Sequence, residues 1–141
     1  MPYKHNELGM TLVTGVKQMF FEGHGDTYDG YEISVNDGVN RIRFGIGGEA
    51  QCCEIYGIEQ LPAIDMVGKK IVNVSLVDCD DDHDEIGHQR RTRACVENCI
   101  ALKLNFDDHM ATTLHAYNTN GYYPHTVYIE YMDGTHVTHN I

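Results

Sequence analysis

Arginine is scarce in this sequence, and the few arginines are grouped. Among the 141 residues, 10 are Lys or Arg and 21 are Asp or Glu, yet Arg41 and Arg43 stand two positions apart and Arg90 and Arg91 are adjacent. A guanidinium group donates two parallel hydrogen bonds to phosphate oxygens. Both pairs are therefore candidates for binding a small anion. Alternatively, Arg90 and Arg91 neutralise the acidic residues that precede them.

A second candidate site is the polar and aromatic segment over residues 116–125. It contains Asn118, Asn120, Tyr122 and Tyr123 around a turn signal at Asn120-Gly121. A tyrosine ring stacks on flat rings and keeps a hydroxyl for hydrogen bonding, and an asparagine amide both donates and accepts. The segment favours a heterocyclic ligand or a partner protein, or else forms a turn whose tyrosines cap the edge of the core.

Metal and catalytic motifs are not evident among the nine histidines and five cysteines. Structural zinc sites need closely spaced ligand pairs, and no C-x-x-C is present. The Asp and His residues over 78–88 lack the register of an EF-hand loop. Cys52 or Cys53 with a distant histidine would make a nucleophile and base, but no local pattern specifies such a pair. We therefore expect no catalytic residue, no metal and no cofactor.

The charge balance limits the partners. The formal net charge is -11, and such a surface repels nucleic acid and anionic membranes over a Debye length of about 8 Å. No apolar run approaches the roughly 20 residues that span a bilayer, and the N-terminus has no hydrophobic signal core. The sequence thus predicts a cytoplasmic protein with no nucleic-acid or membrane partner and with five reduced cysteines.

Period-two alternation predicts a β-hairpin over residues 31–46. Asp37-Gly38 is a dipeptide preferred in tight turns because both residues tolerate positive φ. Apolar residues alternate with polar ones on both sides of this turn: Tyr31, Ile33, Val35, Ile42, Phe44 and Ile46. Such a hairpin places Arg41 and Arg43 on the face away from the core.

The same alternation predicts further strands over residues 11–21, 52–58, 69–77, 95–106, 110–117 and 127–131, with a last hairpin from Asp133-Gly134 into Val137. Gly15 is expected to mark a bend or a bulge, and Ala63 to Val67 are expected to form a short helical turn. The acidic and basic segment 78–94 is expected to be a long loop. The inward positions of the later strands are expected to include Val72, Val74, Leu76, Ile100, Leu102, Leu104, Phe106, Met110, Thr112, Leu114, Ala116, Val127, Ile129 and Tyr131.

These elements predict one mainly β domain over residues 1–141. About seven or eight antiparallel strands would form a curved sheet or a small barrel, with one short helical turn.

Two segments carry a resemblance to known proteins. The first is Gln51-Cys52-Cys53-Glu54-Ile55-Tyr56-Gly57-Ile58-Glu59, after the hairpin, and the second is Asn118-Thr119-Asn120-Gly121-Tyr122-Tyr123, before the strand at 127–131. In order and spacing, this chain resembles a family of small, uncharacterised phage and bacterial proteins with an early (D/Q)CCE motif and a late NGYY turn. In size and β-rich outline it is also similar to the Thoeris anti-defence sponge proteins, which bind nucleotide signals as oligomers without cleaving them.

The resemblance and the residues together predict a function. We expect a non-enzymatic, phage-type binding protein that sequesters a small anionic nucleotide signal, as a homo-oligomer. Its ligand-binding residues would be Arg41, Arg43, Arg90, Arg91, Asn118, Asn120, Tyr122 and Tyr123. The alternatives are an acidic inhibitor that binds a host protein directly and a metal-dependent or cysteine-dependent enzyme.

Overall fold

The described part of the chain consists of β-strands joined by turns. The computed structural model describes residues 11–23, 25–47, 55–78, 97–119 and 124–141. These ranges contain no helix, and their strands are β1 (Thr11–Gly23), β2 (Asp26–Val35), β3 (Asn40–Gly47), β4 (Ile55–Leu61), β5 (Lys70–Asp78), β6 (Glu97–Phe106), β7 (Ala111–Thr119), β8 (Thr126–Glu130) and β9 (His136–Asn140). The predicted mainly β, antiparallel fold is confirmed, with nine strands instead of seven or eight.

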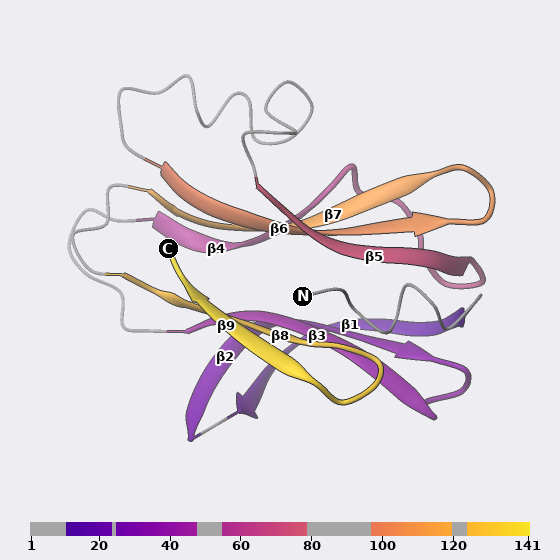
Figure 1. The fold of residues 1–141 in the computed structure, drawn as a ribbon, viewed down its shortest axis with the longest axis horizontal. Coiled ribbons are helices and arrows are strands. Elements are labelled where there is room, and N and C mark those ends of the chain that lie inside the picture. The colour runs from indigo at the N-terminus through magenta and orange to yellow at the C-terminus, as the bar shows by residue number, and fades with distance from the viewer. Residues whose placement is uncertain (1–10, 24, 48–54, 79–96, 120–123) are drawn as a thin grey trace.

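All nine strands belong to one antiparallel sheet, in the order β4-β7-β6-β5-β1-β2-β3-β8-β9. The sheet is curved and does not close into a barrel, because β4 and β9 remain its two ends. Figure 1 shows that it folds over into two layers, an upper layer of β4, β5, β6 and β7 and a lower layer of β1, β2, β3, β8 and β9.

Strand β1 connects the two layers. Its first residues, Thr11 and Leu12, pair with β5, and the strand pairs with β2 from Val13 onward. The register shifts between Val13 and Gly15, which agrees with the bend or bulge predicted at Gly15. A bulge bends a strand and increases its twist, so one continuous strand serves both layers.

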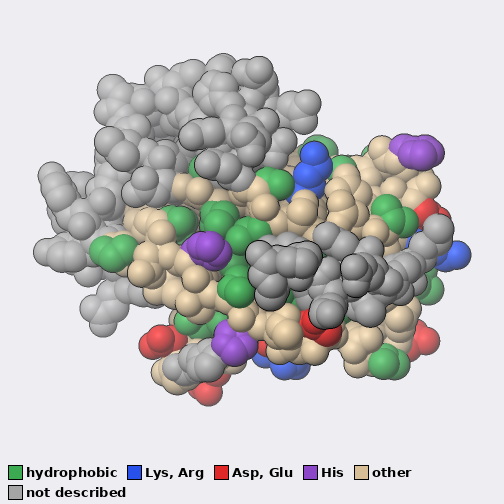
Figure 2. All heavy atoms as spheres, in the orientation of Figure 1, with side chains coloured by type: hydrophobic (Ala, Val, Ile, Leu, Met, Phe, Trp, Pro, Cys, Tyr) green, Lys and Arg blue, Asp and Glu red, His purple; other side chains and the backbone are tan. Residues whose placement is uncertain are grey.

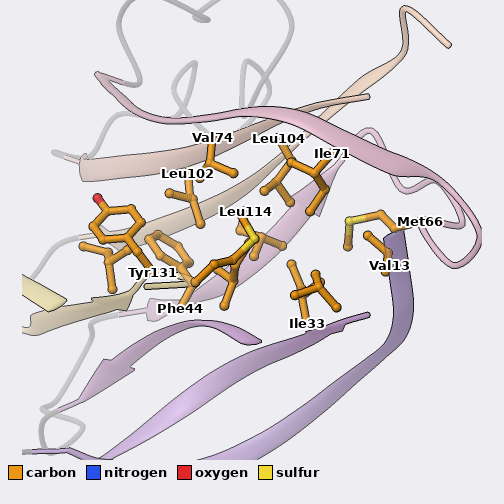
Figure 3. Close-up of a cluster of buried hydrophobic side chains, with 14 of the residues drawn as sticks. Val13, Ile33, Phe44, Met66, Ile71, Val74, Leu102, Leu104, Leu114 and Tyr131 are labelled. Carbon is orange, nitrogen blue, oxygen red and sulfur yellow. The ribbon is translucent and has the colours of Figure 1, made fainter. Parts of the chain in front are cut away.

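The core lies between the layers and follows the predicted alternation closely (Figure 3). Strands of both layers contribute side chains that are at most 2% exposed, among them Ile33, Ile42, Phe44, Leu102, Leu104, Phe106, Leu114, Val127, Ile129 and Tyr131. Burying a large apolar side chain contributes about 1.5–3 kcal/mol to stability. The predicted turns at Asp37-Gly38 and Asp133-Gly134 also form, with positive φ at Asp37, Gly38 and Gly134.

Three local predictions were wrong. Residues 63–67 form no helical turn, since the segment runs irregularly to a turn at Val67 and Gly68. A helix of so few residues does not recover its nucleation cost, and the irregular path buries Met66. A register shift in β5 after Ile71 turns Val72 out of the core and buries Ile71 in its place. Met110 lies just before β7 and is 44% exposed instead of facing the core.

Other sequence predictions lie outside the described residues. The long loop predicted over 78–94 is described only at Asp78, which ends β5. Among the described residues, no helix is long and apolar enough to cross a membrane.

Cys99, in β6, is disulfide-bonded, which corrects the prediction of five reduced cysteines. The other four cysteines lie outside the described residues. Disulfides persist mainly in oxidising compartments, so this bond does not fit the prediction of a reducing cytoplasm.

Counting thiols tests the bond at Cys99. In denaturant without reductant, at most three of the five cysteines should react with a thiol reagent. Cys99→Ser should raise that count by one, because removing one partner frees the other. Five reactive thiols in the unreduced wild-type protein would show that Cys99 is not bonded.

The outer face of the lower layer carries a second, smaller apolar cluster of Phe21, Tyr28 and Tyr128, with Met19 packed against it. The rings of Tyr28 and Tyr128 stack with centroids 5.0 Å apart. Glycines form the surface beneath them, since a Cβ at Gly45 would lie 2.6 Å from the Phe21 ring. Small residues at these strand positions therefore let the aromatic rings lie flat on the sheet.

Gly30 is the most demanding of these glycines. A Cβ there would overlap the carbonyl oxygen of Phe44 on the neighbouring strand, whereas a Cβ at Gly15 would lie an ordinary 3.8 Å from Ser34. Gly30→Ala should cost about 3 kcal/mol of unfolding free energy, and the matched Gly15→Ala less than about 1 kcal/mol. Urea denaturation measures both, and equal losses would refute the close approach of β2 and β3 at this position.

Candidate functional site

The described parts of the two segments that carry the family resemblance, residues 55–59 and 118–119, lie against each other in the sheet. Strand β4 pairs with β7, so that Ile55 lies opposite Thr119 and Tyr56 opposite Asn118. Both strands belong to the upper layer (Figure 1). Residues distant in sequence are therefore neighbours at the end of the molecule where β3 stops and β4 begins.

Asn118 joins the two layers at this end. Its side chain is 1% exposed, and its amide nitrogen donates to the carbonyl oxygen of Ile141 at 3.1 Å. Ile141 in turn exchanges two backbone hydrogen bonds with His125, each 2.9 Å long. The predicted ligand-binding residue Asn118 thus has a structural role, because it holds the upper layer to the C-terminal end of the lower one.

His125 fixes the position of Tyr56. Its ring is 1% exposed, and Nδ1 lies 2.9 Å from the carbonyl oxygen of Gly47. A carbonyl oxygen only accepts, so Nδ1 carries the hydrogen. The rings of His125 and Tyr56 stack, with centroids 3.9 Å apart and planes 18° apart. The Tyr56 ring is therefore held flat by a histidine that is itself held by the backbone of β3.

Beside Tyr56, the two layers leave a cleft of about 550 Å³, which we call the interlayer cleft. This volume is within the range of small-molecule sites, about 300–1,000 Å³. The described residues that line it are Phe20, Thr27, Asp29, Ile46, Gly47, Tyr56 and Gly57.

A row of three side chains forms one wall of the interlayer cleft. Phe20 on β1 lies opposite Asp29 on β2, and Asp29 lies opposite Ile46 on β3. Directly opposed residues point to the same face of a sheet, and this face is the one that carries Ile33 and Phe44 into the core. Phe20 is nevertheless 70% exposed. The row therefore extends the core-facing surface into the cleft, with one apolar ring and one carboxylate available.

The charged side chain in the described lining of the interlayer cleft is acidic. This described lining includes the carboxylate of Asp29 and no Lys or Arg. Burial raises the pKa of the nearby Tyr31 phenol, and the carboxylates of Glu59 and Asp29 raise that pKa further. Carboxylates on both layers therefore act on the same region, which favours a ligand that presents N–H donors or positive charge.

Arg41 and Arg43 lie on the opposite side of the lower layer. Arg43 Nε donates to Glu32 Oε1 at 2.9 Å, and Arg41 Nε donates to Glu130 Oε2 at 3.0 Å. Lys17 adds a longer contact to Glu32, at 4.0 Å. We call these five residues the charge ladder, since they alternate in sign across β1, β2, β3 and β8.

The charge ladder also contacts the aromatic cluster on that outer face. The Arg43 guanidinium lies 5.1 Å from the centroid of the Phe21 ring, a cation–π distance. Tyr128 donates from its hydroxyl to Glu130 at 3.0 Å. Burial raises the pKa of Tyr128, and this hydrogen bond raises that pKa further. The two arginines are thus engaged within the sheet.

The structure does not bring the described members of the predicted site together. Arg41 and Arg43 lie on the outer face, whereas Asn118 is buried between the layers. Arg90, Arg91, Asn120, Tyr122 and Tyr123 lie outside the described residues. In the view of Figure 2, Lys and Arg side chains are few and separated.

Sequence reasoning missed the residues of the interlayer cleft. Tyr56 belongs to the early segment of the family resemblance, but no role was assigned to it. Asp29 had a usable signal, because alternation from Ile33 and Tyr31 puts this carboxylate on the core-facing side of its strand. The same alternation places Phe20 on the core-facing side of β1, because it lies four positions from Val16.

Other chemistry finds no support in the described residues. No group of three or more His, Cys, Asp or Glu side chains there could hold a metal ion. Comparison with known proteins gives no match to a family model, a curated protein or a solved structure. The resemblance to the phage and bacterial family therefore stays a prediction.

Removing Arg43 should affect stability. The Arg43 and Glu32 side chains are only 15% and 13% exposed, so Arg43→Ala leaves a shielded carboxylate without its strongest partner. We expect a loss of about 1–2 kcal/mol in unfolding free energy. Lys17→Ala is the control, because that side chain is 65% exposed and its loss should cost less than about 0.5 kcal/mol. Chemical denaturation separates the two, and an equal effect would remove the structural role of Arg43.

Proposed function

We propose that the protein is a binding protein that sequesters a small nucleotide-type ligand without converting it, and that the base of the ligand occupies the interlayer cleft. The observation that carries the proposal is Phe20, a 70% exposed aromatic ring, beside the acceptor Asp29 on its neighbouring strand. Ligand pockets are lined mainly by apolar and aromatic side chains with a few polar groups, and a base over Phe20 would cover this ring.

The chemistry of the interlayer cleft suits a base better than a phosphate. A nucleobase offers an apolar face to the exposed Phe20 ring, and stacking contributes about 1–3 kcal/mol per base. Its N–H groups can donate to the carboxylate of Asp29, which only accepts. A phosphate would be repelled by the same carboxylate. In this proposal the phosphate points away from Asp29 toward solvent.

The choice of a nucleotide, and of an anionic immune signal in particular, is supported by the family resemblance. On that reading the protein is phage-encoded and acts in the cytoplasm of an infected cell. Arg90, Arg91, Asn120, Tyr122 and Tyr123 stay candidate contacts for the rest of the ligand. The disulfide at Cys99 argues against a reducing compartment, and the thiol count therefore also tests this placement.

The alternative of an acidic inhibitor has a different basis. A net charge of -11 accelerates association with a basic surface and makes it sensitive to salt. This alternative needs no ligand in the interlayer cleft, so substitutions inside the cleft should leave it intact.

Titration calorimetry with the full chain tests the proposed site. The panel contains nucleosides, mononucleotides, cyclic dinucleotides and ADP-ribose derivatives. Phe20→Ala should weaken binding by about five- to a hundredfold, the equivalent of one lost stacking contact. Val39→Ala is the matched control, since Val39 is 76% exposed and lies on the β2–β3 turn, outside the cleft. Both substitutions should change stability by less than about 0.5 kcal/mol.

A second pair of variants tests the acceptor. Asp29→Asn should weaken binding of the same ligand, whereas Asp26→Asn, on the opposite face of β2, should not. Binding that is indifferent to both Phe20→Ala and Asp29→Asn would exclude the interlayer cleft. No binding across the panel would favour the protein-partner alternative, and chemical conversion of any ligand would make the protein an enzyme.

A further inference from the structure

Among the described strands, β9 lies at one end of the sheet, and its pairing with β8 shows which of its backbone groups point outward. His125 and Ile141 exchange two backbone hydrogen bonds, and the same ladder pairs Val127 with His139 and Ile129 with Val137. In an antiparallel ladder, hydrogen-bonded and non-hydrogen-bonded pairs alternate. The backbone N–H and C=O groups of the residues between them therefore point away from β8: His136, Thr138 and Asn140.

The described residues of β9 carry none of the sequence features that usually prevent an edge strand from pairing. Natural edge strands carry charged residues, Pro or bulges that prevent the addition of another strand. Residues 136–140 read HVTHN and contain no Asp, Glu, Lys, Arg, Pro or Gly, in a chain with 21 acidic residues. By contrast, β4 at the other end of the sheet contains Gly57 and Glu59 and leads into Pro62.

We propose that two copies of the chain associate through this edge, with β9 pairing antiparallel to β9 of the second copy. An antiparallel pair of identical strands has two-fold symmetry and closes as a dimer. Centring the pair on Thr138 aligns all five residues, so that Thr138 opposes Thr138 and His136 opposes Asn140. Because residues 136–140 carry no carboxylate, the paired strands themselves add no repulsion between two strongly acidic molecules.

The occupant is a second copy and not an unrelated peptide, because the outward groups are self-complementary. Each of the three outward residues supplies one donor and one acceptor, and the centred register uses all of them. Four of the five side chains are exposed, so pairing requires no rearrangement of the core. The dimer is independent of the ligand proposed for the interlayer cleft.

Sedimentation velocity of the full, ligand-free chain tests the dimer over a range of concentrations, with a non-reducing gel to exclude covalent dimers. The wild-type protein should dimerise. Thr138→Pro removes an outward N–H that makes no bond to β8, and it should weaken dimerisation at least about tenfold because the bond is lost twice in a symmetric pair. Thr138→Val keeps the N–H and should dimerise like the wild type.

Charge variants keep the test decisive if Thr138→Pro does not fold. Thr138 is exposed, so Thr138→Glu and Thr138→Lys should fold normally, and each alone should be monomeric because like charges meet at the two-fold axis. A mixture of the two should form a heterodimer. A monomeric wild-type protein, or a wild-type dimer that these substitutions leave unchanged, would overturn the proposal.

Discussion

The rest of the structure depends on one strand that changes its partner. Strand β1 pairs with β5 at Thr11 and Leu12 and then, after the bulge between Val13 and Gly15, with β2. Without this change the strands would extend as one open sheet with an uncovered apolar face. With it, the four strands of the upper layer fold over the five of the lower layer (Figure 1). The core and the interlayer cleft both exist because of this bend.

The bend alone does not fix how far apart the layers stand at their open end. Polar contacts set that spacing, since Asn118 donates to the carbonyl oxygen of Ile141 and His125 binds the carbonyl oxygen of Gly47. Tyr56 stacks on His125, so one wall of the interlayer cleft is positioned from the opposite layer. Buried hydrogen bonds of this kind hold a defined geometry because leaving them unmade costs about 1–3 kcal/mol each.

The fold was largely predictable because its determinants are local. Alternation of period two identifies strand faces, and Asp37-Gly38 identifies a turn, without knowledge of distant residues. The wrong predictions concern residues whose burial depends on how the strands pair. Val72 fits the alternation of β5, but the register shift after Ile71, set by pairing with β6, reverses which residue is buried. The disulfide of Cys99 is likewise a property of partners in space, which cysteine spacing alone does not give.

The candidate site was less predictable because residue type does not reveal the neighbours. Arg43 and Arg41 have the chemistry of anion ligands, yet Glu32 and Glu130, the latter 89 residues away from Arg41, occupy them. The chain has 21 acidic and 10 basic residues. An arginine on a sheet face therefore readily pairs with a carboxylate of the same chain, which leaves it less available to a ligand. The interlayer cleft requires the register of three strands to place Phe20 beside Asp29 and Asp29 beside Ile46.

These internal pairings narrow where recognition can occur. On the outer face of the lower layer, the aromatic cluster packs against glycines and the charge ladder pairs its own arginines. A ligand there would have to break contacts that stabilise the sheet. Phe20 and Asp29, in contrast, extend the core-facing surface of the lower layer into the cleft. At the other candidate surface, β9 is the last of the described strands in the sheet. A base bound in the cleft would therefore extend the packing of the core. A strand added at β9 would extend the backbone hydrogen bonding of the sheet.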